Sequence, residues 1–201
     1  FSDSQRLGFD PAFSNDGQWL SYVAPVEIGI GVINLQDGRE RMLTDGTGEN
    51  GVWHPNRPEL VAAQVMTTST LYYSHLVATN VETGIRTDLS GADAAVFDDS
   101  PAFSPDGSWI AFRRKVNEGD LATPGKQIWV MRADGSEARA LTASADHDHA
   151  TPQWSFDGER ITFHRYNLRN APIVIATMVY DVAADTYWEA ASPAQDPMWF
   201  R

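Results

Sequence analysis

The residues best suited to chemistry in this chain form an alternation of aspartate and histidine, Asp146-His147-Asp148-His149. Imidazole nitrogens and carboxylate oxygens are both ligands of transition metals. Neighbouring side chains of an extended segment point to opposite sides, so only His147 and His149 would share a side. Further ligands would have to come from elsewhere, with Asp98 or Asp99 as the candidates. A polar surface loop explains the motif equally simply, so we expect neither a cofactor nor a bound metal and keep the two histidines as candidate ligands.

Acidic residues also stand just before several short apolar segments. They are Asp10, Glu49, Asp98, Asp99, Asp148 and Asp196. If these segments repeat around an axis, the carboxylates gather at the mouth of a central channel, where they could attract a cationic peptide or hold a hard cation. The same carboxylates could instead cap their own strands and turns, as aspartate often does. Both interpretations stay open.

Basic and aromatic residues follow two of the apolar segments. One group is Arg113-Arg114-Lys115, and the other contains Arg165, Tyr166 and Arg169. Guanidinium groups beside an aromatic ring could clamp an acidic protein segment or a sugar acid. They could equally form local salt bridges, which contribute little when exposed. Together with Asp98, Asp99, Asp148 and His149, these residues form the binding surface that we predict.

Several other chemistries find no support. The chain has no cysteine, so it holds no disulfide, thiol nucleophile or cysteine-ligated metal. It contains neither a Gly-x-Ser-x-Gly elbow nor a His-Glu-x-x-His zinc motif. The segment 46–51 matches the dinucleotide-binding string, but no helix is expected after it, so we interpret it as a connection. We assign no catalytic residue.

Net charge and hydropathy limit the classes of partner that the chain could bind. The net charge of −12 argues against nucleic acid, which requires a basic face. No run approaches the roughly 20 apolar residues that a membrane-spanning helix needs, so we expect no membrane insertion. The first residues, Phe1-Ser2-Asp3-Ser4, lack the basic and apolar regions of a signal peptide, as a mature exported protein would.

A recurring phrase identifies the elements that position these groups. It reads Pro11-Ala12-Phe13-Ser14-Asn15-Asp16-Gly17, recurs at 101–107 and 152–158, and has a more divergent copy at 51–57. Its aromatic anchors are Phe13, Trp53, Phe103, Trp154 and Trp199, separated by 40, 50, 51 and 45 residues. A period of this size indicates a solenoid, a propeller or another repeat array. We expect the first four anchors to be buried in equivalent positions.

Each repeat predicts four short strands. The phrase gives a first strand and an Asp-Gly turn, and three more strands follow, separated by a variable loop and a second tight turn. This pattern predicts an all-β fold, a β-propeller of four-stranded antiparallel blades at about 8–47, 48–94, 95–145 and 146–192. Residues 5–7 and 196–199 would belong to flanking blades. We therefore expect residues 1–201 to be one propeller region of a larger ring, because an open ring leaves bare sheet edges.

The third repeat carries a family resemblance. Ser104-Pro105-Asp106-Gly107-Ser108-Trp109-Ile110-Ala111-Phe112, followed by the strand and turn at 127–142, resembles the propeller repeat of the TolB family. The same repeat occurs in propeller domains of prolyl-oligopeptidase-type and tricorn-type peptidases. The resemblance implies a periplasmic or secreted protein that works with envelope partners, and the sequence leaves a cytoplasmic location open.

Strand order places the predicted binding residues on one end of the propeller. In antiparallel blades, the tight turns share one end, while the variable loops and the blade-to-blade connections share the other, where function is usually found. We therefore predict a non-catalytic module that docks a protein or peptide on the variable-loop end. The alternatives are a gating propeller of a larger serine peptidase and a metal-assisted enzyme acting on polysaccharide.

Overall fold

The structure, a computed structural model, describes residues 8–24, 29–44, 49–67, 72–91, 95–169 and 173–192. Within these ranges every regular element is a strand, and no helix long and apolar enough to cross a membrane is found. The sixteen strands are β1 (Phe9–Phe13), β2 (Trp19–Ala24), β3 (Gly29–Asn34), β4 (Glu40–Thr44), β5 (Val52–Trp53), β6 (Glu59–Thr67), β7 (Tyr72–Asn80), β8 (Arg86–Asp88), β9 (Val96–Phe103), β10 (Trp109–Val116), β11 (Gln127–Arg132), β12 (Arg139–Ala140), β13 (His147–Trp154), β14 (Arg160–Asn167), β15 (Ile175–Asp181) and β16 (Thr186–Ala191).

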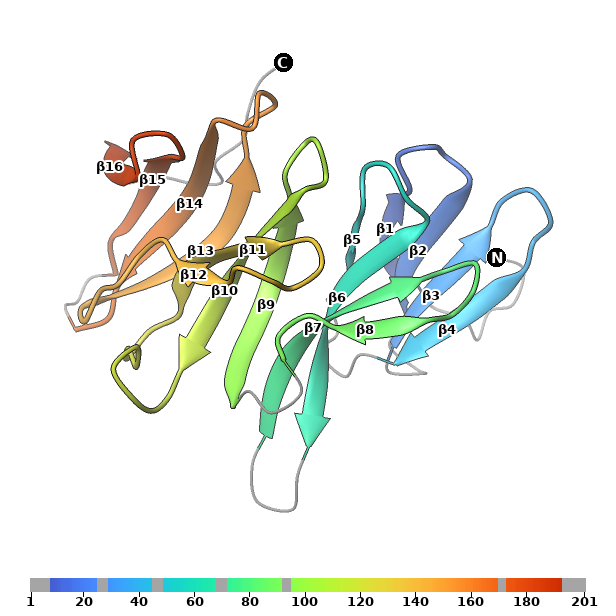
Figure 1. Cartoon of the computed structure of the whole chain (residues 1–201), viewed down its shortest axis with the longest axis horizontal. Coiled ribbons are helices and arrows are strands. Elements are labelled where there is room, and N and C mark those ends of the chain that lie inside the picture. Colours follow the sequence, from blue (N-terminus) through green and yellow to red (C-terminus); the bar gives the residue numbers. More distant parts are fainter. Residues whose placement is uncertain are drawn as a thin grey trace.

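The strands form antiparallel four-stranded units that stand side by side (Figure 1). We call β1–β4, β5–β8, β9–β12 and β13–β16 blades 1 to 4. A parallel pairing of Ser74 with Phe97 joins blades 2 and 3 into one continuous sheet. The predicted all-β propeller architecture is confirmed.

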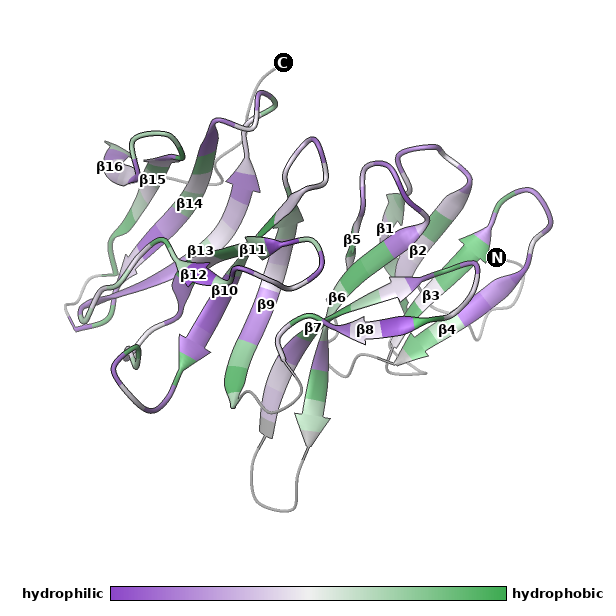
Figure 2. Ribbon diagram, in the orientation of Figure 1, coloured by the Kyte–Doolittle hydropathy of each residue, from purple (hydrophilic) through white to green (hydrophobic). Residues whose placement is uncertain are grey.

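The hydrophobic core lies between successive blades. In the cluster between blades 2 and 3, Val61 and Leu76 pack with Ile110 and Phe112, and all four side chains are fully buried. Alternate residues of a strand point to opposite faces, so each central strand supplies two cores. Figure 2 shows the resulting hydrophobic bands along the middle strands. Burying each such side chain stabilises the fold by about 1.5–3 kcal/mol.

Aspartate–glycine turns connect the first strand to the second in three of the blades. Gly17, Gly107 and Gly158 have φ of 70°, 76° and 72°, a region that glycine adopts without strain. In blade 3 the Asp106 carboxylate accepts hydrogen bonds from the Ser104 hydroxyl (2.5 Å) and from the backbone N–H of Ser108 (3.0 Å). These bonds hold the pKa of Asp106 at about 2. The predicted turns are confirmed.

The corresponding turn of blade 2 differs, as its sequence predicts. His54 replaces the serine, and its ring Nδ1 accepts the N–H of Asn56 at 3.0 Å. Arg57 stands where the other blades have glycine, and it does not adopt a positive φ.

Three of the four aromatic anchors contact the core, and one does not. Trp53, Phe103 and Trp154 pack against the clusters between blades 1–2, 2–3 and 3–4. The indoles of Trp53 and Trp154 each donate a hydrogen bond of 3.1 Å, to the carbonyls of Ala12 and Ala102 in a preceding blade. Phe13 is 65% exposed, so its predicted burial is wrong. An anchor packs against the blade before it, and the described residues contain no blade before Phe13.

A bulge interrupts the first strand of three blades just before its proline. Asp10, Ser100 and Thr151 have φ of 53°, 49° and 50°, and the pairing register shifts beside each of them. A bulge inserts one extra residue and re-aims the side chains on either side of it. Each first strand therefore has one half before the bulge and another that continues to the tight turn.

Some sequence predictions fall outside the described residues. These are the flanking-blade segments 5–7 and 196–199, the acidic residue Asp196, the anchor Trp199, and residues 46–48 of the glycine-rich connection.

Candidate functional site

The predicted binding residues share one end of the propeller. We call the end with the loops between second and third strands the loop end, and the end with the tight turns the turn end (Figure 1). Asp98 and Asp99 lie on β9, opposite Arg114 and Arg113 of β10. Asp148 and His149 lie on β13, opposite Tyr166 and Arg165 of β14, and Arg169 follows β14.

Asp98 and Arg114 form a buried ion pair. The guanidinium donates two hydrogen bonds to the carboxylate, at 2.7 Å from Nε to Oδ1 and 2.6 Å from Nη2 to Oδ2. Asp98 is 0% exposed and Arg114 8% exposed, and the guanidinium also lies over the rings of Phe112 and Trp129. Burial raises the pKa of Asp98, although Arg114 and Ser90 act in the opposite direction. This pair is part of the core between blades 2 and 3.

A hydrogen-bonded chain continues from this pair into blade 2. The Ser90 hydroxyl donates to Asp98 Oδ2 at 2.5 Å, and the backbone N–H of Ser90 donates to Asp88 Oδ1 at 2.9 Å. Asp88 Oδ2 lies 2.8 Å from Nδ1 of the buried His75. The Ser74 hydroxyl donates to the Asp98 carbonyl at 2.8 Å. Blades 2 and 3 are thus held together by a polar network beneath the loop end.

Asp99 points the other way, toward blade 4. It bonds the ammonium of Lys126 and lies 3.6 Å from Nη1 of Arg113. Arg113 donates from Nε to the His149 carbonyl at 2.9 Å. Asp148 accepts the Lys126 N–H at 2.9 Å. Blades 3 and 4 are therefore joined by a second network, and Asp98 and Asp99 serve different interfaces.

His149 is a buried, neutral side chain in this second interface. Its Nδ1 lies 3.0 Å from Gln127 Oε1 and 3.1 Å from the Thr142 hydroxyl, while its ring meets Phe163 edge-on. Burial, reinforced by His147, Arg165 and Arg113, lowers the pKa of His149 to about 3. His147 lies beside it, with Nδ1 2.9 Å from the Ser144 hydroxyl. In the described part of the chain no group of three or more His, Asp or Glu side chains converges as a metal site would.

The basic residues of blade 4 are exposed or half-buried and are paired locally. Arg165 donates to Glu189 Oε2 at 2.6 Å. Arg169 lies 3.4 Å from Asp146, and both side chains are about two thirds exposed. Tyr166 is half-buried and meets the ring of His164 edge-on. These three residues lie on the accessible part of the loop end.

The structure corrects one part of the predicted surface. Asp98, Arg114 and His149 are buried, so they do not themselves form an accessible binding surface. Asp98 and Asp99 are paired with Arg114, Arg113 and Lys126, so they do not form an open acidic ring. Burying an unpaired carboxylate is costly, and pairing with Arg114 offsets part of that cost at Asp98.

Sequence reasoning missed residues that complete the networks. Lys126 and Ser90 contact Asp99 and Asp98, yet neither stands in a repeated motif. Strand register offers a signal for Lys126, because its neighbour Gln127 pairs with Arg114 across β10 and β11.

The first strands of all four blades line a groove along the propeller axis. The groove has a volume of about 640 Å3, and its walls include Phe13, Trp53, Phe103 and Trp154. The parts of β9 and β13 that line it, Ala102–Phe103 and Gln153–Trp154, follow the bulges, whereas Asp99 and Asp148 precede them. That the acidic group lies nearer the axis than the basic group stays a prediction.

Comparison with known proteins shows the fold. No protein-family model matches the chain. The uncharacterized protein Atu1656 of Agrobacterium fabrum is 27% identical over 161 residues, which are 79% of this chain and 51% of that protein. The chain thus spans about half the length of the curated relative that it matches.

Solved structures give the same fold at low sequence identity. TolB from Acinetobacter baumannii matches with a TM-score of 0.59 and 17% identity over 92% of this chain and 43% of TolB. An oligogalacturonate lyase in complex with manganese matches with a TM-score of 0.63 and 17% identity, covering 92% and 53% of the two chains. The tricorn protease matches with a TM-score of 0.72 and 10% identity, covering 96% and 23%. The fold is that of TolB-like propellers. Because this fold carries binding proteins and enzymes alike, it does not determine the function.

Proposed function

We propose that this propeller is a non-catalytic module that docks a protein or peptide on its loop end. The observation that carries the proposal is a group of exposed apolar side chains on the loops of two neighbouring blades. Leu121 is 59% exposed on the loop after β10, and Leu168, Ile173 and Val174 are 43%, 72% and 47% exposed on the loop after β14. Exposed apolar side chains at the same end of two adjacent blades favour a protein-interaction surface there.

The networks beneath these loops support the same proposal. Arg113 of β10 and Lys126, at the end of the β10–β11 loop, are hydrogen-bonded to β13 of blade 4, and Leu168 donates its N–H to the Asp146 carbonyl. A binding surface that is already ordered loses less conformational entropy on association. The predicted binding residues thus act here mainly as a rigid support, and the exposed loop residues make the contact.

Charge defines the kind of partner that fits. The chain carries a net charge of −12, so long-range attraction favours a cationic partner. Around the exposed apolar residues, Arg169 and Asp146 offer charges of both signs. We therefore propose a partner segment with apolar side chains and a net positive charge. The periplasm, implied by the TolB resemblance, is its proposed location.

A peptide selection tests this proposal. Peptides selected from a random library on the immobilised chain should bind through the loop end, so Ile173→Ser should weaken them about tenfold, as loss of a large apolar contact typically does. The matched control is Ile85→Ser, since Ile85 is 67% exposed at the turn end. Equal affinity of the selected peptides for both variants would contradict the proposal.

A second candidate is a gating propeller attached to a peptidase domain. The similarity to the tricorn protease, with a TM-score of 0.72, favours it. The gene sequence that adjoins Arg201 would decide, because a Gly-x-Ser-x-Gly elbow there would identify a catalytic serine domain.

A further inference from the structure

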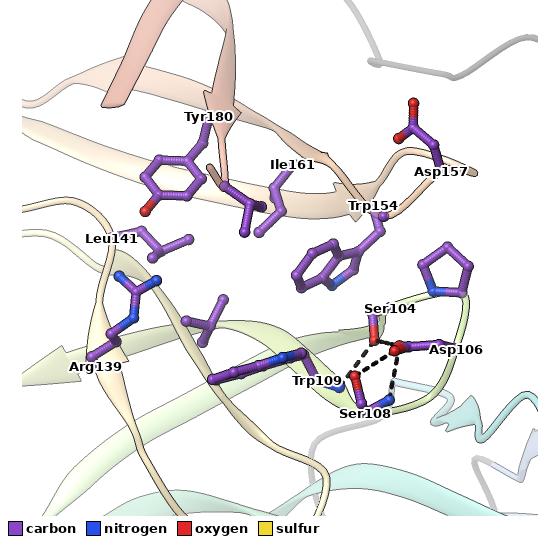
Figure 3. A pocket seen from close by; sticks show the side chains of 14 residues that line it. Ser104, Asp106, Ser108, Trp109, Arg139, Leu141, Trp154, Asp157, Ile161 and Tyr180 are labelled. Carbon is purple, nitrogen blue, oxygen red and sulfur yellow. Dashed lines mark hydrogen bonds between the residues drawn. The ribbon is translucent and has the colours of Figure 1, made fainter. Parts of the chain in front are cut away.

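A cavity lies at the turn end, between blades 3 and 4, away from the proposed docking surface. Its volume is about 350 Å3, within the size range of small-molecule sites. Trp109, Trp154, Leu141 and Ile161 supply its apolar wall (Figure 3). The charged groups that line it are two carboxylates and one guanidinium, from Asp106, Asp157 and Arg139.

At the other two interfaces an asparagine side chain links the neighbouring turns, and among the residues that the structure describes no such link is found beside this cavity. Asn15 of blade 1 donates from its side chain to the Pro55 carbonyl of blade 2 at 2.9 Å. Asn56 of blade 2 donates to the Asp106 carbonyl of blade 3 at 3.3 Å. In blade 3 the positions of Asn15 and Asn56 are taken by Pro105 and Asp106, neither of which has a side-chain N–H donor. In the described chain no side-chain hydrogen bond joins the turn at 105–107 to the turn at 156–158.

The residues that match two of the cavity walls are packed more closely at the other two interfaces. Between blades 2 and 3, the His54 ring packs edge-on against Phe103 and leaves no room for a Cβ on Gly107. In blade 3 the small Ser104 replaces His54. Between blades 1 and 2, Trp19 is only 5% exposed, whereas the equivalent Trp109 is half-buried beside the cavity.

The groups around the cavity favour a positive charge. Arg132 lies over the Trp109 ring, 4.1 Å from its centroid, and its own charge is paired with Glu137 at 3.3 Å, so this indole already makes one cation–π contact. Hydrogen bonds from serine hydroxyls and backbone N–H groups keep both Asp106 and Asp157 ionised. Arg139 is occupied by Asp185, 3.3 Å away. The carboxylates of Asp106 and Asp157 therefore leave a negative charge that a bound ligand could balance.

We propose that the cavity binds an organic cation, in which an ammonium or guanidinium group is attached to an aromatic or branched apolar group. The apolar group would lie between Trp109 and Trp154, and the charged group would lie at the rim with Asp106 and Asp157. Such a group could come from a free small amine or from a lysine or arginine side chain of a peptide. The test below distinguishes these sources.

Three probes that share a phenylethyl group and differ in the charge of their end group test the charge preference. 2-Phenylethylamine should shift the indole N–H resonances of Trp109 and Trp154 in a saturable way and leave that of Trp19 unchanged. It should bind about five- to tenfold more tightly than 2-phenylethanol or 3-phenylpropionate, the gain expected from a cation–π contact and a partly exposed ion pair. An acetylated peptide amide with one arginine tests the peptide source: tighter binding than the amine assigns the site to a peptide, and weaker binding assigns it to a small amine.

Two variants separate the cavity from unspecific binding. Pro105→Asn restores the asparagine that closes the interface of blades 1 and 2, and it should weaken the amine at least about tenfold through loss of the cation–π and apolar contacts. Phe156→Asn alters the same turn position in blade 4 and should leave binding unchanged. The proposal is overturned if neither the amine nor the peptide shifts the two indoles, if the alcohol or the carboxylate binds as well as the amine, or if Pro105→Asn binds like the unchanged chain.

Discussion

Removing Arg114 should destabilise the propeller strongly, and more at neutral pH than at acidic pH. In Arg114→Met the apolar contacts with Phe112 and Trp129 are largely kept, but Asp98 loses two hydrogen bonds of 2.7 and 2.6 Å while remaining 0% exposed. Breaking a buried ion pair from one side costs about 3–5 kcal/mol. Domains of this kind have a total stability of about 5–15 kcal/mol, so the loss should be easy to measure.

The pH dependence follows from the direction of the Asp98 pKa. Burial already raises this pKa above its usual value, and removal of Arg114 raises it further. A raised pKa in the folded state means that stability is fully present below the unfolded pKa and is lost as pH rises through the folded pKa. The deficit of Arg114→Met relative to the unchanged chain should therefore be smaller at about pH 4.5 than at about pH 7.5, because protonated Asp98 tolerates burial.

Urea unfolding followed by tryptophan fluorescence measures this deficit. Arg169→Met is the matched control, because Arg169 is paired with Asp146 in an exposed position and should cost at most about 1 kcal/mol. The double variant Asp98→Asn with Arg114→Met should recover part of the loss, since no charge is then left buried. A deficit below about 1 kcal/mol, or one that does not change with pH, would refute the assignment of a buried pair.

Three further predictions concern the turns and the anchors. Gly107→Ala should destabilise more than Gly17→Ala, by about 1 kcal/mol or more in urea unfolding, because both have positive φ but only the Cβ at 107 would meet the His54 ring; equal costs would contradict the contact. Trp154→Phe should lower the free energy of unfolding by about 1 kcal/mol more than its lost apolar contacts account for, because it also removes the indole hydrogen bond to the Ala102 carbonyl. A decrease that the lost apolar contacts explain by themselves would argue against that bond. Hydrogen bonds lower the pKa of Asp106 to about 2, so the stability that its carboxylate contributes should be present above about pH 4 and lost as pH falls through about 2. Asp106→Asn should lack this acid-dependent part of the stability. If the free energy of unfolding falls equally steeply with acid in both proteins, the carboxylate makes no such contribution.

The repeat made the blade architecture predictable from sequence. Asp-Gly pairs fixed the positive φ at Gly17, Gly107 and Gly158, because few other residues adopt it without strain. Anchor spacing correctly placed Trp53 and Trp154 between blades. Phe13 failed because burial depends on the neighbouring blade, which a local motif does not describe.

The candidate site was less predictable because it depends on register. Strand order correctly placed the acidic and basic residues at one end. Whether Asp98 or Asp99 points to blade 2 or to blade 4 depends on the bulge at Ser100, since a shift by one residue reverses the faces of a strand. No residue type marks that bulge in three blades alike, as Asp10, Ser100 and Thr151 share only the following proline. Pairing of the carboxylates was therefore an alternative that the sequence left open.

Amide hydrogen exchange of the chain with a selected peptide bound tests the central proposal most directly. Docking on the loop end should slow exchange around Leu121 and Leu168, which lie on exposed loops, and leave exchange at the turn residues 105–107 unchanged. Protection centred on the turns, with the loops unchanged, would contradict the proposal that the loop end is the docking surface.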